Sequence, residues 1–170
     1  MEIDIREAVP EDAANLLEAL DIIRKESDFL TMDETDTEIS EQWQAAHLAN
    51  LYESSNNVLL LALDGEKIVG TASIHADQHR RISHIGDIGI SILKAYQGVG
   101  IGRVLFSELV QWAKESGRIF RLQLTVQKRN TKAIQLYKQN GFTVEAEMER
   151  GAIDADGNFL TVYMMSKMID

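Results

Sequence analysis

The chain has 170 residues, of which 45% are hydrophobic and 26% are charged, and its formal net charge is −10. These values are typical of one globular domain, exclude a disordered chain, and argue against binding to nucleic acid or to an anionic membrane. Cysteine is absent, which excludes disulfides, thiolate metal sites and a cysteine nucleophile. The acidic start, Met1 to Asp4, does not resemble a signal peptide, and the longest apolar run, Val58 to Leu63, is too short to span a bilayer. We therefore expect a cytoplasmic protein.

The charge is unevenly distributed along the chain. Residues 1–56 hold 15 acidic and 3 basic side chains, a net charge of −12, whereas residues 57–170 hold 12 acidic and 14 basic side chains, a net charge of +2. Such asymmetry is typical of halves that meet different partners, but two helices with acidic outer faces would give the same counts. Composition alone favours the second explanation.

The first third of the chain predicts one short strand and two helices. Residues 3–6 alternate like a strand. Pro10 suits the first turn of a helix, and an apolar stripe follows it at Leu16, Leu17, Leu20, Ile22 and Ile23. A second helix is predicted over residues 40–52, with Trp43, Ala46 and Leu51 facing inward.

From residue 58 onward, strands and helices alternate. Strands over 58–63 and 68–74 flank the turn Asp64-Gly65, and a polar loop over 77–81 leads to a strand over 83–93. A helix over 99–116, with Ile101, Val104, Leu105, Leu109 and Trp112 on its apolar side, ends at Gly117. The remaining predicted elements are a strand over 120–126, a helix over 130–140 and strands over 142–149 and 159–167. The alternation favours a parallel strand pair with a helical crossover, inside a mixed sheet, in one domain over residues 1–170.

Three alternate glycines, Gly98, Gly100 and Gly102, lie between a predicted strand and a predicted helix. Glycines allow close backbone approach, and a helix N-terminus presents free N–H groups to an anion, so this loop predicts a phosphate site. The Walker pattern is absent. The dinucleotide pattern would need glycine at Arg103 and an acidic residue about 20 positions later, which leaves a nicotinamide-dependent reductase as a weak alternative.

The loop Gln97-Gly98-Val99-Gly100-Ile101-Gly102 is similar to the Q/R-x-x-G-x-G/A signature of the GNAT acetyltransferase superfamily. Downstream, Val126, Asn130, Ala133, Tyr137 and Gly141-Phe142 resemble that family's second motif. The resemblance covers residues 58–168. Within the family, the sequence is most similar to single-domain bacterial enzymes that acetylate amino acids, protein N-termini or polyamines. It implies an α/β fold of the α+β type: a mixed, mostly antiparallel seven-stranded sheet, with strands four and five parallel and splayed, and about four helices. Residues 1–56 would form the acceptor side and residues 57–170 the acetyl-CoA-binding core.

The resemblance also implies the residues of a cofactor site for acetyl-CoA. The backbones of Ile90 and Ile92 would pair with the pantetheine arm, as an extended ligand pairs with an open strand edge. Amide groups of the glycine loop would hold the pyrophosphate; this set is Gln97, Gly98, Val99, Gly100, Ile101, Gly102 and Arg103. Asn130 and Ala133 would complete the site, although Asn130 is also a good N-cap. Lys128, Arg129, Lys132 and Lys138 could meet the 3′-phosphate or form a solvated face.

For catalysis, the resemblance assigns Tyr137 as the general acid that protonates the departing thiolate, against the alternative of a core aromatic. Asp87 is the candidate general base, against a purely structural hydrogen-bond acceptor, with His84 or a water chain as further candidates. Alternation places Asp87 and Gly89 on one face of the strand unless a bulge occurs near Gly89. Without cysteine, we expect direct transfer in a ternary complex, with a strand N–H at Ile90 or Ile92 as oxyanion donor and no metal.

The sequence says less about the acceptor and the oligomeric state than about the cofactor. A small-molecule or peptide amine is expected as the acceptor, and a cationic one is favoured by Asp28, Asp33, Glu34, Asp36, Glu38 and Glu41 around the predicted inter-helix segment. A homodimer is expected because final strands in this family often pair. The competing hypothesis from another class is a non-catalytic sensor module that binds acyl-CoA.

Overall fold

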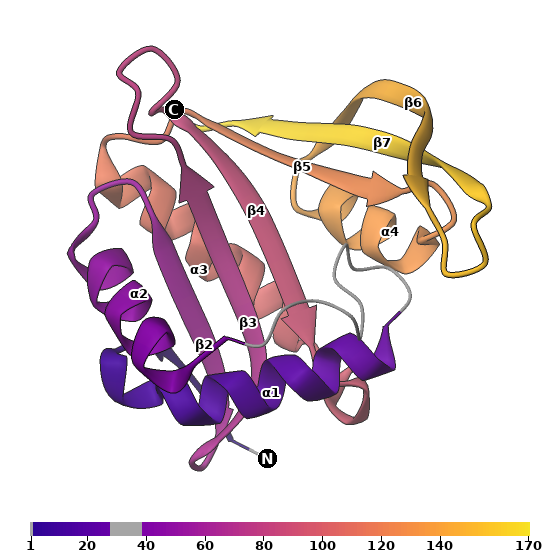
Figure 1. Ribbon diagram of the computed structural model, residues 1–170. Coiled ribbons are helices and arrows are strands. Elements are labelled where there is room, and N and C mark those ends of the chain that lie inside the picture. Colours follow the sequence, from indigo (N-terminus) through magenta and orange to yellow (C-terminus); the bar gives the residue numbers. More distant parts are fainter. Residues whose placement is uncertain (1, 28–38) are drawn as a thin grey trace.

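The computed structural model describes residues 2–27 and 39–170. Seven strands in these residues form one mixed sheet in the order β1-β2-β3-β4-β5-β7-β6, and β4 and β5 are its parallel pair (Figure 1). The strands are β1 (Ile3–Glu7), β2 (Val58–Asp64), β3 (Lys67–Ala76), β4 (Ile85–Ile92), β5 (Arg121–Gln127), β6 (Thr143–Ile153) and β7 (Phe159–Met168). The predicted fold class is confirmed.

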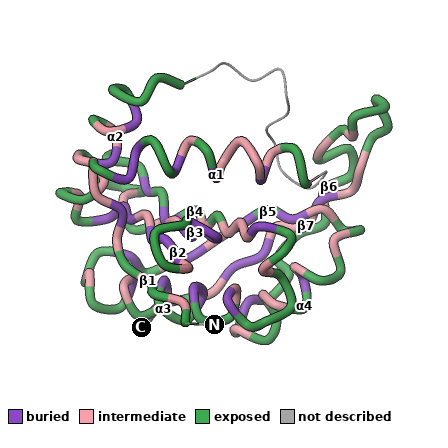
Figure 2. Tube along the Cα trace, turned by 90° about the horizontal axis from the view of Figure 1, so that it is seen from below, coloured by how far each residue is buried: buried purple, intermediate pink, exposed green. Residues whose placement is uncertain are grey.

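Helices cover both faces of the sheet. Figure 2 shows α1 and α2 on one side, and α3 and α4 on the other. The helices are α1 (Ala13–Glu26), α2 (Glu41–Glu53), α3 (Ile101–Ser116) and α4 (Thr131–Gln139). Pro10 begins a single 3₁₀ turn that leads into α1, so this helix starts three residues later than Pro10. No helix within residues 2–27 and 39–170 has the length and apolar character needed to cross a membrane.

The core has two layers, because β2 is buried on both faces. Leu60 and Ala62 belong to the cluster formed with α3, whereas Leu61 and Leu63 belong to the cluster formed with α1 and α2. This explains the continuous apolar run of β2, since a strand that is covered on both sides has no solvent-facing positions. Phe106 of α3 is fully buried between the sheet and α4.

The feature that defines the site is the short ladder between β4 and β5. Only three pairs join them, and the last is Asp87 with Gln123. Beyond this pair the strands part (Figure 1), while β5 stays paired with β7 along its whole length. The second half of β4 therefore has one free edge, as the expected splay requires.

Several boundaries differ from the predicted ones. The strand expected over 83–93 spans Ile85–Ile92, because residues 80–84 form turns and Lys94–Tyr96 form a 3₁₀ turn. The helix expected from residue 99 begins at Ile101, since Gly100 has a left-handed conformation. The strand expected over 142–149 continues to Ile153, with register shifts against β7 that accommodate its extra residues.

Two predicted helix faces are wrong in detail. Trp43 and Ala46 of α2 are exposed, whereas Gln44 and Leu48 are buried, and Leu51 packs partly buried against the core as predicted. Trp43 instead stacks on His47 at 4.9 Å between ring centroids, so its apolar surface is partly covered within the helix itself. In α3, Val104 is half exposed. Both helices are covered on one side only, and the sequence period alone leaves the exact rotation open.

Candidate active site

The free edge of β4 presents main-chain groups to the splay. The Leu93 N–H donates to the Val69 carbonyl on β3 at 2.9 Å, so alternation turns the N–H and C=O of Ile90 and Ile92 away from β3 and toward β5. The Ile92 carbonyl, however, already accepts a 3.0 Å hydrogen bond from the Gln97 side chain. Ile90 thus offers both of its main-chain groups, while Ile92 offers only its N–H.

The glycine loop joins β4 to the N-terminus of α3. Gly98 and Gly100 have φ values of +79° and +92°, which side-chain-bearing residues rarely adopt, and a Cβ at either position would meet nothing within 4 Å. Gly102 differs, because a Cβ there would lie 3.2 Å from Ile92 Cδ1. The first two glycines shape an open loop in front of free helix amides, and the third permits close packing of α3 on β4. Arg103 is exposed on the first turn of α3.

Tyr137 lies on α4 within an aromatic cluster. Its ring centroid is 5.6 Å from that of Phe106 and 6.2 Å from that of Phe142. Burial raises the pKa of the Tyr137 phenol, and its hydroxyl makes no hydrogen bond to any residue in the described part of the chain. A phenol that stays protonated at neutral pH can donate to a departing thiolate. The cluster fixes the ring and leaves the hydroxyl available.

Asn130 and Ala133 form the start of α4. The Asn130 side-chain oxygen accepts the Ala133 N–H at 3.3 Å, which confirms the N-cap interpretation. Because this oxygen is engaged, the Asn130 side chain has its amide NH₂ group left as a donor. Leu136, one turn further on, lies 3.4 Å from a Cβ built at Gly102, so α4 also packs beside the glycine loop.

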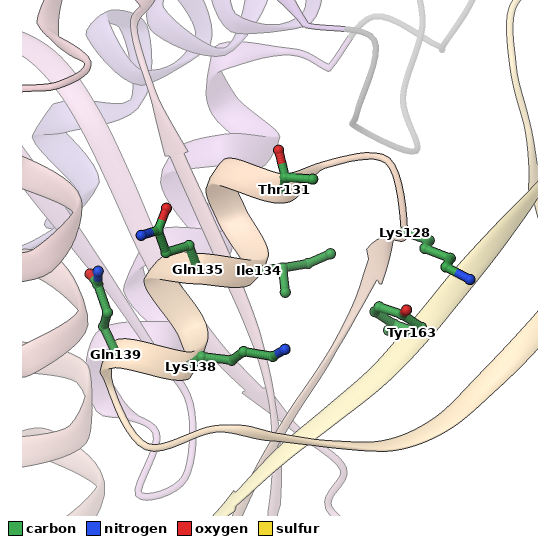
Figure 3. Close-up of a pocket in the computed structure, with 7 residues that line it drawn as sticks. All are labelled: Lys128, Thr131, Ile134, Gln135, Lys138, Gln139 and Tyr163. Atoms are coloured by element: carbon green, nitrogen blue, oxygen red, sulfur yellow. The ribbon is translucent and has the colours of Figure 1, made fainter.

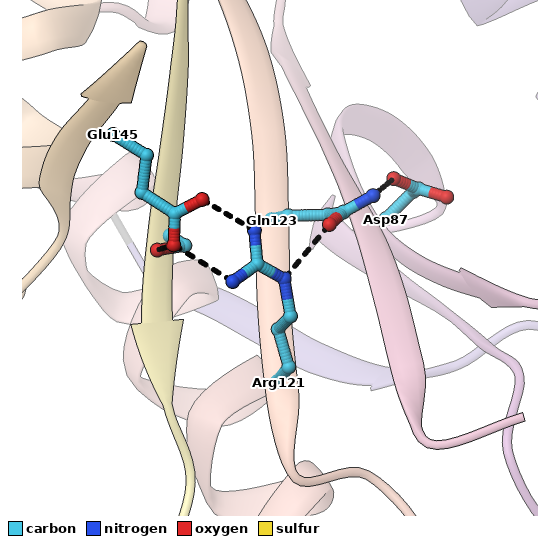
Figure 4. A network of polar contacts seen from close by, with 5 residues as sticks. Asp87, Arg121, Gln123 and Glu145 are labelled. Atoms are coloured by element: carbon cyan, nitrogen blue, oxygen red, sulfur yellow. Dashed lines mark hydrogen bonds and ion pairs between the residues drawn. The ribbon is translucent and has the colours of Figure 1, made fainter. Parts of the chain in front are cut away.

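Asp87 is the last residue of β4 to pair with β5, and it is exposed. Its Oδ1 accepts a 2.9 Å hydrogen bond from Gln123 Nε2, and Gln123 Oε1 accepts one of 2.9 Å from Arg121 Nε. Arg121 in turn donates to both carboxylate oxygens of Glu145, at 2.7 and 2.8 Å (Figure 4). Hydrogen bonds from Arg121 and Ser166 lower the pKa of Glu145 to about 2.

This network was not foreseen from the sequence. Arg121, Gln123 and Glu145 are ordinary polar residues of strands, and only the register across β4, β5, β7 and β6 brings them together. The other candidate base, His84, is exposed and precedes β4; its carbonyl accepts the N–H groups of Phe120 and Arg121. The pairing of β3 with β4 has no register shift at Gly89, so the face predicted for Asp87 is retained.

Two of the basic residues considered for the 3′-phosphate, Lys128 and Lys138, line a separate hollow. Lys128 pairs with Glu147 at 2.6 Å and lies 5.8 Å from the centre of the Tyr163 ring. Figure 3 shows Ile134 and Lys138 of α4 pointing toward Tyr163 and Lys128 across an open hollow of about 650 Å³. None of its lining residues belongs to β4 or to the glycine loop. Lys128 is therefore not a free cation at the splay.

The acidic segment that motivated a cationic acceptor falls mostly outside the described residues; this applies to Asp28, Asp33, Glu34, Asp36 and Glu38. Glu41 is described, and it is exposed in the first turn of α2. Among residues 2–27 and 39–170, no three His, Asp or Glu side chains are grouped as metal ligands.

Comparisons with known proteins agree on one family. The family model described as "Acetyltransferase (GNAT) family" matches residues 22–142. The crystal structure of an acetyltransferase of GNAT family from Streptococcus pneumoniae is 42% identical, has a TM-score of 0.97, and is matched over 99% of this chain and 100% of that chain.

Two further relatives are similar over different lengths. The L-amino acid N-acetyltransferase AaaT of Escherichia coli K12 is 30% identical over 110 residues, which are 65% of this chain and 67% of that protein. The structure of yncA from Salmonella typhimurium with its cofactor acetyl-CoA is 22% identical, with a TM-score of 0.86 over 100% of this chain and 95% of that chain. At that identity it shows the fold alone.

Proposed function

Because the chain belongs to the GNAT family of acetyltransferases, we propose that it transfers the acetyl group of acetyl-CoA directly to a primary amine within a ternary complex. The observation that carries this proposal is the free edge of β4, which runs from the glycine loop at the N-terminus of α3 to the carboxylate of Asp87. No cysteine is present to carry an acetyl group, which favours direct transfer.

The layout of the site supports one orientation of acetyl-CoA. Its pyrophosphate would lie against the amides that follow Gly98 and Gly100, where the helix N-terminus favours an anion. Its pantetheine arm would run along Ile92 and Ile90. Five residues of extended strand span about 17 Å, so the thioester would arrive near Asp87 and Gln123, where the ladder closes. The site thus binds the anionic part of the molecule at its open end.

Acetyl-CoA supplies an activated thioester, and the chain supplies the proton transfers and the alignment. Asp87 accepts a proton from the acceptor ammonium, so that the neutral amine can form the C–N bond. The Ile90 N–H donates to the thioester oxygen as negative charge develops there. Tyr137 donates its phenolic proton to the sulfur as the C–S bond breaks, the acylated nitrogen loses its second proton to reprotonate the phenolate through water, and Asp87 releases its proton to solvent. The products are the N-acetylated amine and CoA with a free thiol.

The acceptor class follows from charge and from similarity. A net charge of −12 in residues 1–56 would concentrate cationic amines at the acceptor side, an effect that salt screens. AaaT, by its name, acetylates L-amino acids, which supports the α-amino group as the reacting centre. A polyamine, a basic peptide N-terminus or a basic amino acid satisfies the first argument, and amino acids in general satisfy the second. A cytoplasmic location and a homodimer remain predictions.

The deciding experiment is an acetylation screen of the purified chain with acetyl-CoA. Free thiol release is followed with acidic, neutral and basic amino acids, polyamines and peptide N-termini, and the products are identified by mass. We expect turnover with at least one class and the highest kcat/KM for a cationic amine. A rise in melting temperature with acetyl-CoA but no turnover with any amine would instead support a sensor module. A rise with a nicotinamide cofactor alone would favour the reductase.

A further inference from the structure

We propose that Gln123 is a positioning residue for the transfer reaction: held by Arg121, it orients the Asp87 carboxylate toward the acceptor amine. This inference rests on the role proposed for Asp87 as the proton acceptor. Gln123 belongs to neither family motif, and its position becomes apparent only in the assembled sheet (Figure 4).

The chemistry of Arg121 fixes the direction of the chain of hydrogen bonds. A guanidinium can only donate, so the group of Gln123 that faces Arg121 Nε must be the carbonyl oxygen. The Gln123 amide NH₂ must then point the other way, to Asp87. An amide donor at this distance favours the charged form of a carboxylate and holds its Oδ1 in place. The orientation of Gln123 therefore follows from its partner.

The Arg121 side chain is itself held at its far end. A β-bulge lies between Val144 and Ala146 of β6, so Glu145 is the extra residue and lies out of register with β7. Bulges of this kind redirect a side chain. Here Glu145 reaches across β7, accepts both terminal N–H groups of Arg121 and also accepts the Ser166 hydroxyl. Three strands thus contribute to the fixed position of one glutamine.

Asp87 has one oxygen left for a substrate. Its Oδ1 is occupied by Gln123, while Oδ2 makes no hydrogen bond to residues 2–27 or 39–170. The pair lies where the β4–β5 ladder ends, at the closed end of the splay. The other titratable side chains on this face of the neighbouring strands are His75, which pairs with Asp87 across β3 and β4, Arg121 on β5 and Glu145 on β6. An exposed aspartate without such a contact would sample several rotamers.

The first test replaces Gln123 by Leu, which removes both hydrogen bonds, and by Glu, which can still accept from Arg121 but adds a negative charge beside Asp87. We expect kcat to fall roughly 10- to 100-fold in Gln123→Leu, the range for one hydrogen bond to a charged group, with KM for acetyl-CoA unchanged. The fall in kcat/KM at low pH should move to higher pH in Gln123→Leu. It should move further in Gln123→Glu, because the added negative charge opposes ionisation of the neighbouring carboxyl group. The matched control is Gln111→Leu, which removes the 2.8 Å bond of an exposed glutamine to Glu115 on α3.

The second test is a double-mutant cycle with Asp87→Asn. If Gln123 acts through Asp87, Gln123→Leu lowers kcat in the wild-type background and has no further effect in the Asp87→Asn background. An equal loss in both backgrounds, or an unmoved pH profile, would overturn the positioning role while leaving the transferase and its base intact. A near wild-type rate for Asp87→Asn would overturn the assignment of the base, and the positioning role with it, although acetyl transfer would persist. The variant His75→Asn shows whether the His75 imidazole contributes to the fall in kcat/KM at low pH.

Discussion

Gly100 and Gly157 form a natural pair for testing the cofactor loop. Their φ values are +92° and +84°, and a Cβ at either position meets nothing within 4 Å. A change to alanine therefore imposes the same backbone strain at both sites and no steric clash. For a residue with a side chain, the left-handed region costs about 1–2 kcal/mol. For a chain of this size, each kcal/mol lowers the melting temperature by roughly 2–4 °C.

The two variants should differ in their affinity for acetyl-CoA. Gly100 precedes α3 in the loop proposed to hold the pyrophosphate, whereas Gly157 lies in the turn between β6 and β7. A methyl group at residue 100 would occupy space that a phosphate needs, so Gly100→Ala should bind acetyl-CoA at least about tenfold more weakly. Gly100→Asp should bind more weakly still, because its charge repels phosphate. Gly157→Ala should bind as the wild type does.

Circular dichroism melts give the loss of stability, and calorimetric titration with acetyl-CoA gives the affinity. Equal melting temperatures for Gly100→Ala and Gly157→Ala would confirm that strain alone acts on folding. If the two variants then bound acetyl-CoA with equal affinity, the glycine loop would not be the pyrophosphate site. Retained affinity in a folded Gly100→Asp variant would refute the same reasoning more strongly.

Four other perturbations follow from the structure. Tyr137→Phe removes a hydroxyl without a partner among the described residues, so the free energy of unfolding should change by less than about 0.5 kcal/mol while kcat falls roughly 10²–10⁴-fold. Single-turnover rates near those of the wild type would show that Tyr137 contributes to packing and not to proton transfer. Glu145→Gln tests linkage: because the folded-state pKa of Glu145 is lowered from 4.5 to about 2, its ion pair stabilises the fold above pH 4.5 and is lost as the pH falls toward 2. The difference in melting temperature between wild type and variant should close over that range, and a difference that is constant with pH would contradict the cause assigned. Gly86→Ala would place a Cβ 2.5 Å from Ile74 Cγ2 and should lower denaturant stability by about 1–3 kcal/mol, more than Gly89→Ala, whose Cβ would meet only Ser73 Oγ at 3.1 Å. Finally, kcat/KM for a cationic acceptor should fall between low and moderate salt, and a flat salt dependence would argue that the acidic residues serve only solubility.

The order of strands and helices was predictable because each element carries a local signal. The apolar run of β2, the Asp64-Gly65 turn and the glycines that end α3 and α4 are all readable within a few residues. The glycine loop was predictable for the same reason, since its chemistry is contained in consecutive positions. It was not predictable that two glycines of the loop are open while Gly102 is packed. This difference depends on the position of Ile92 across the contact between helix and strand.

The polar network could not be predicted, since its members are brought together by register. Glu145 meets Arg121 only because β7 is inserted between β5 and β6 and because a bulge displaces Glu145. Likewise, Gln97 belongs to the predicted loop, but the hydrogen bond by which its side chain occupies the Ile92 carbonyl depends on how the loop folds back on β4. The predicted rotation of α2 is wrong at Trp43 because the apolar residues of this helix are spread around its circumference and do not define a single face.

The insertion of β7 between β5 and β6 also constrains the order in which the molecule can fold. Strands β1 to β4 lie next to one another in the sheet in the order in which they leave the ribosome, so this half can form through local pairing. Strand β5 has only three pairs with β4, and its continuous partner is β7, which follows the other six strands of the sheet in chain order. The wall of the splay formed by β5 therefore stays incomplete until β7 has entered the sheet. A nascent chain that has formed its glycine loop would still lack a finished cofactor site, and disruption of β7 would abolish acetyl-CoA binding without touching a residue that contacts the cofactor.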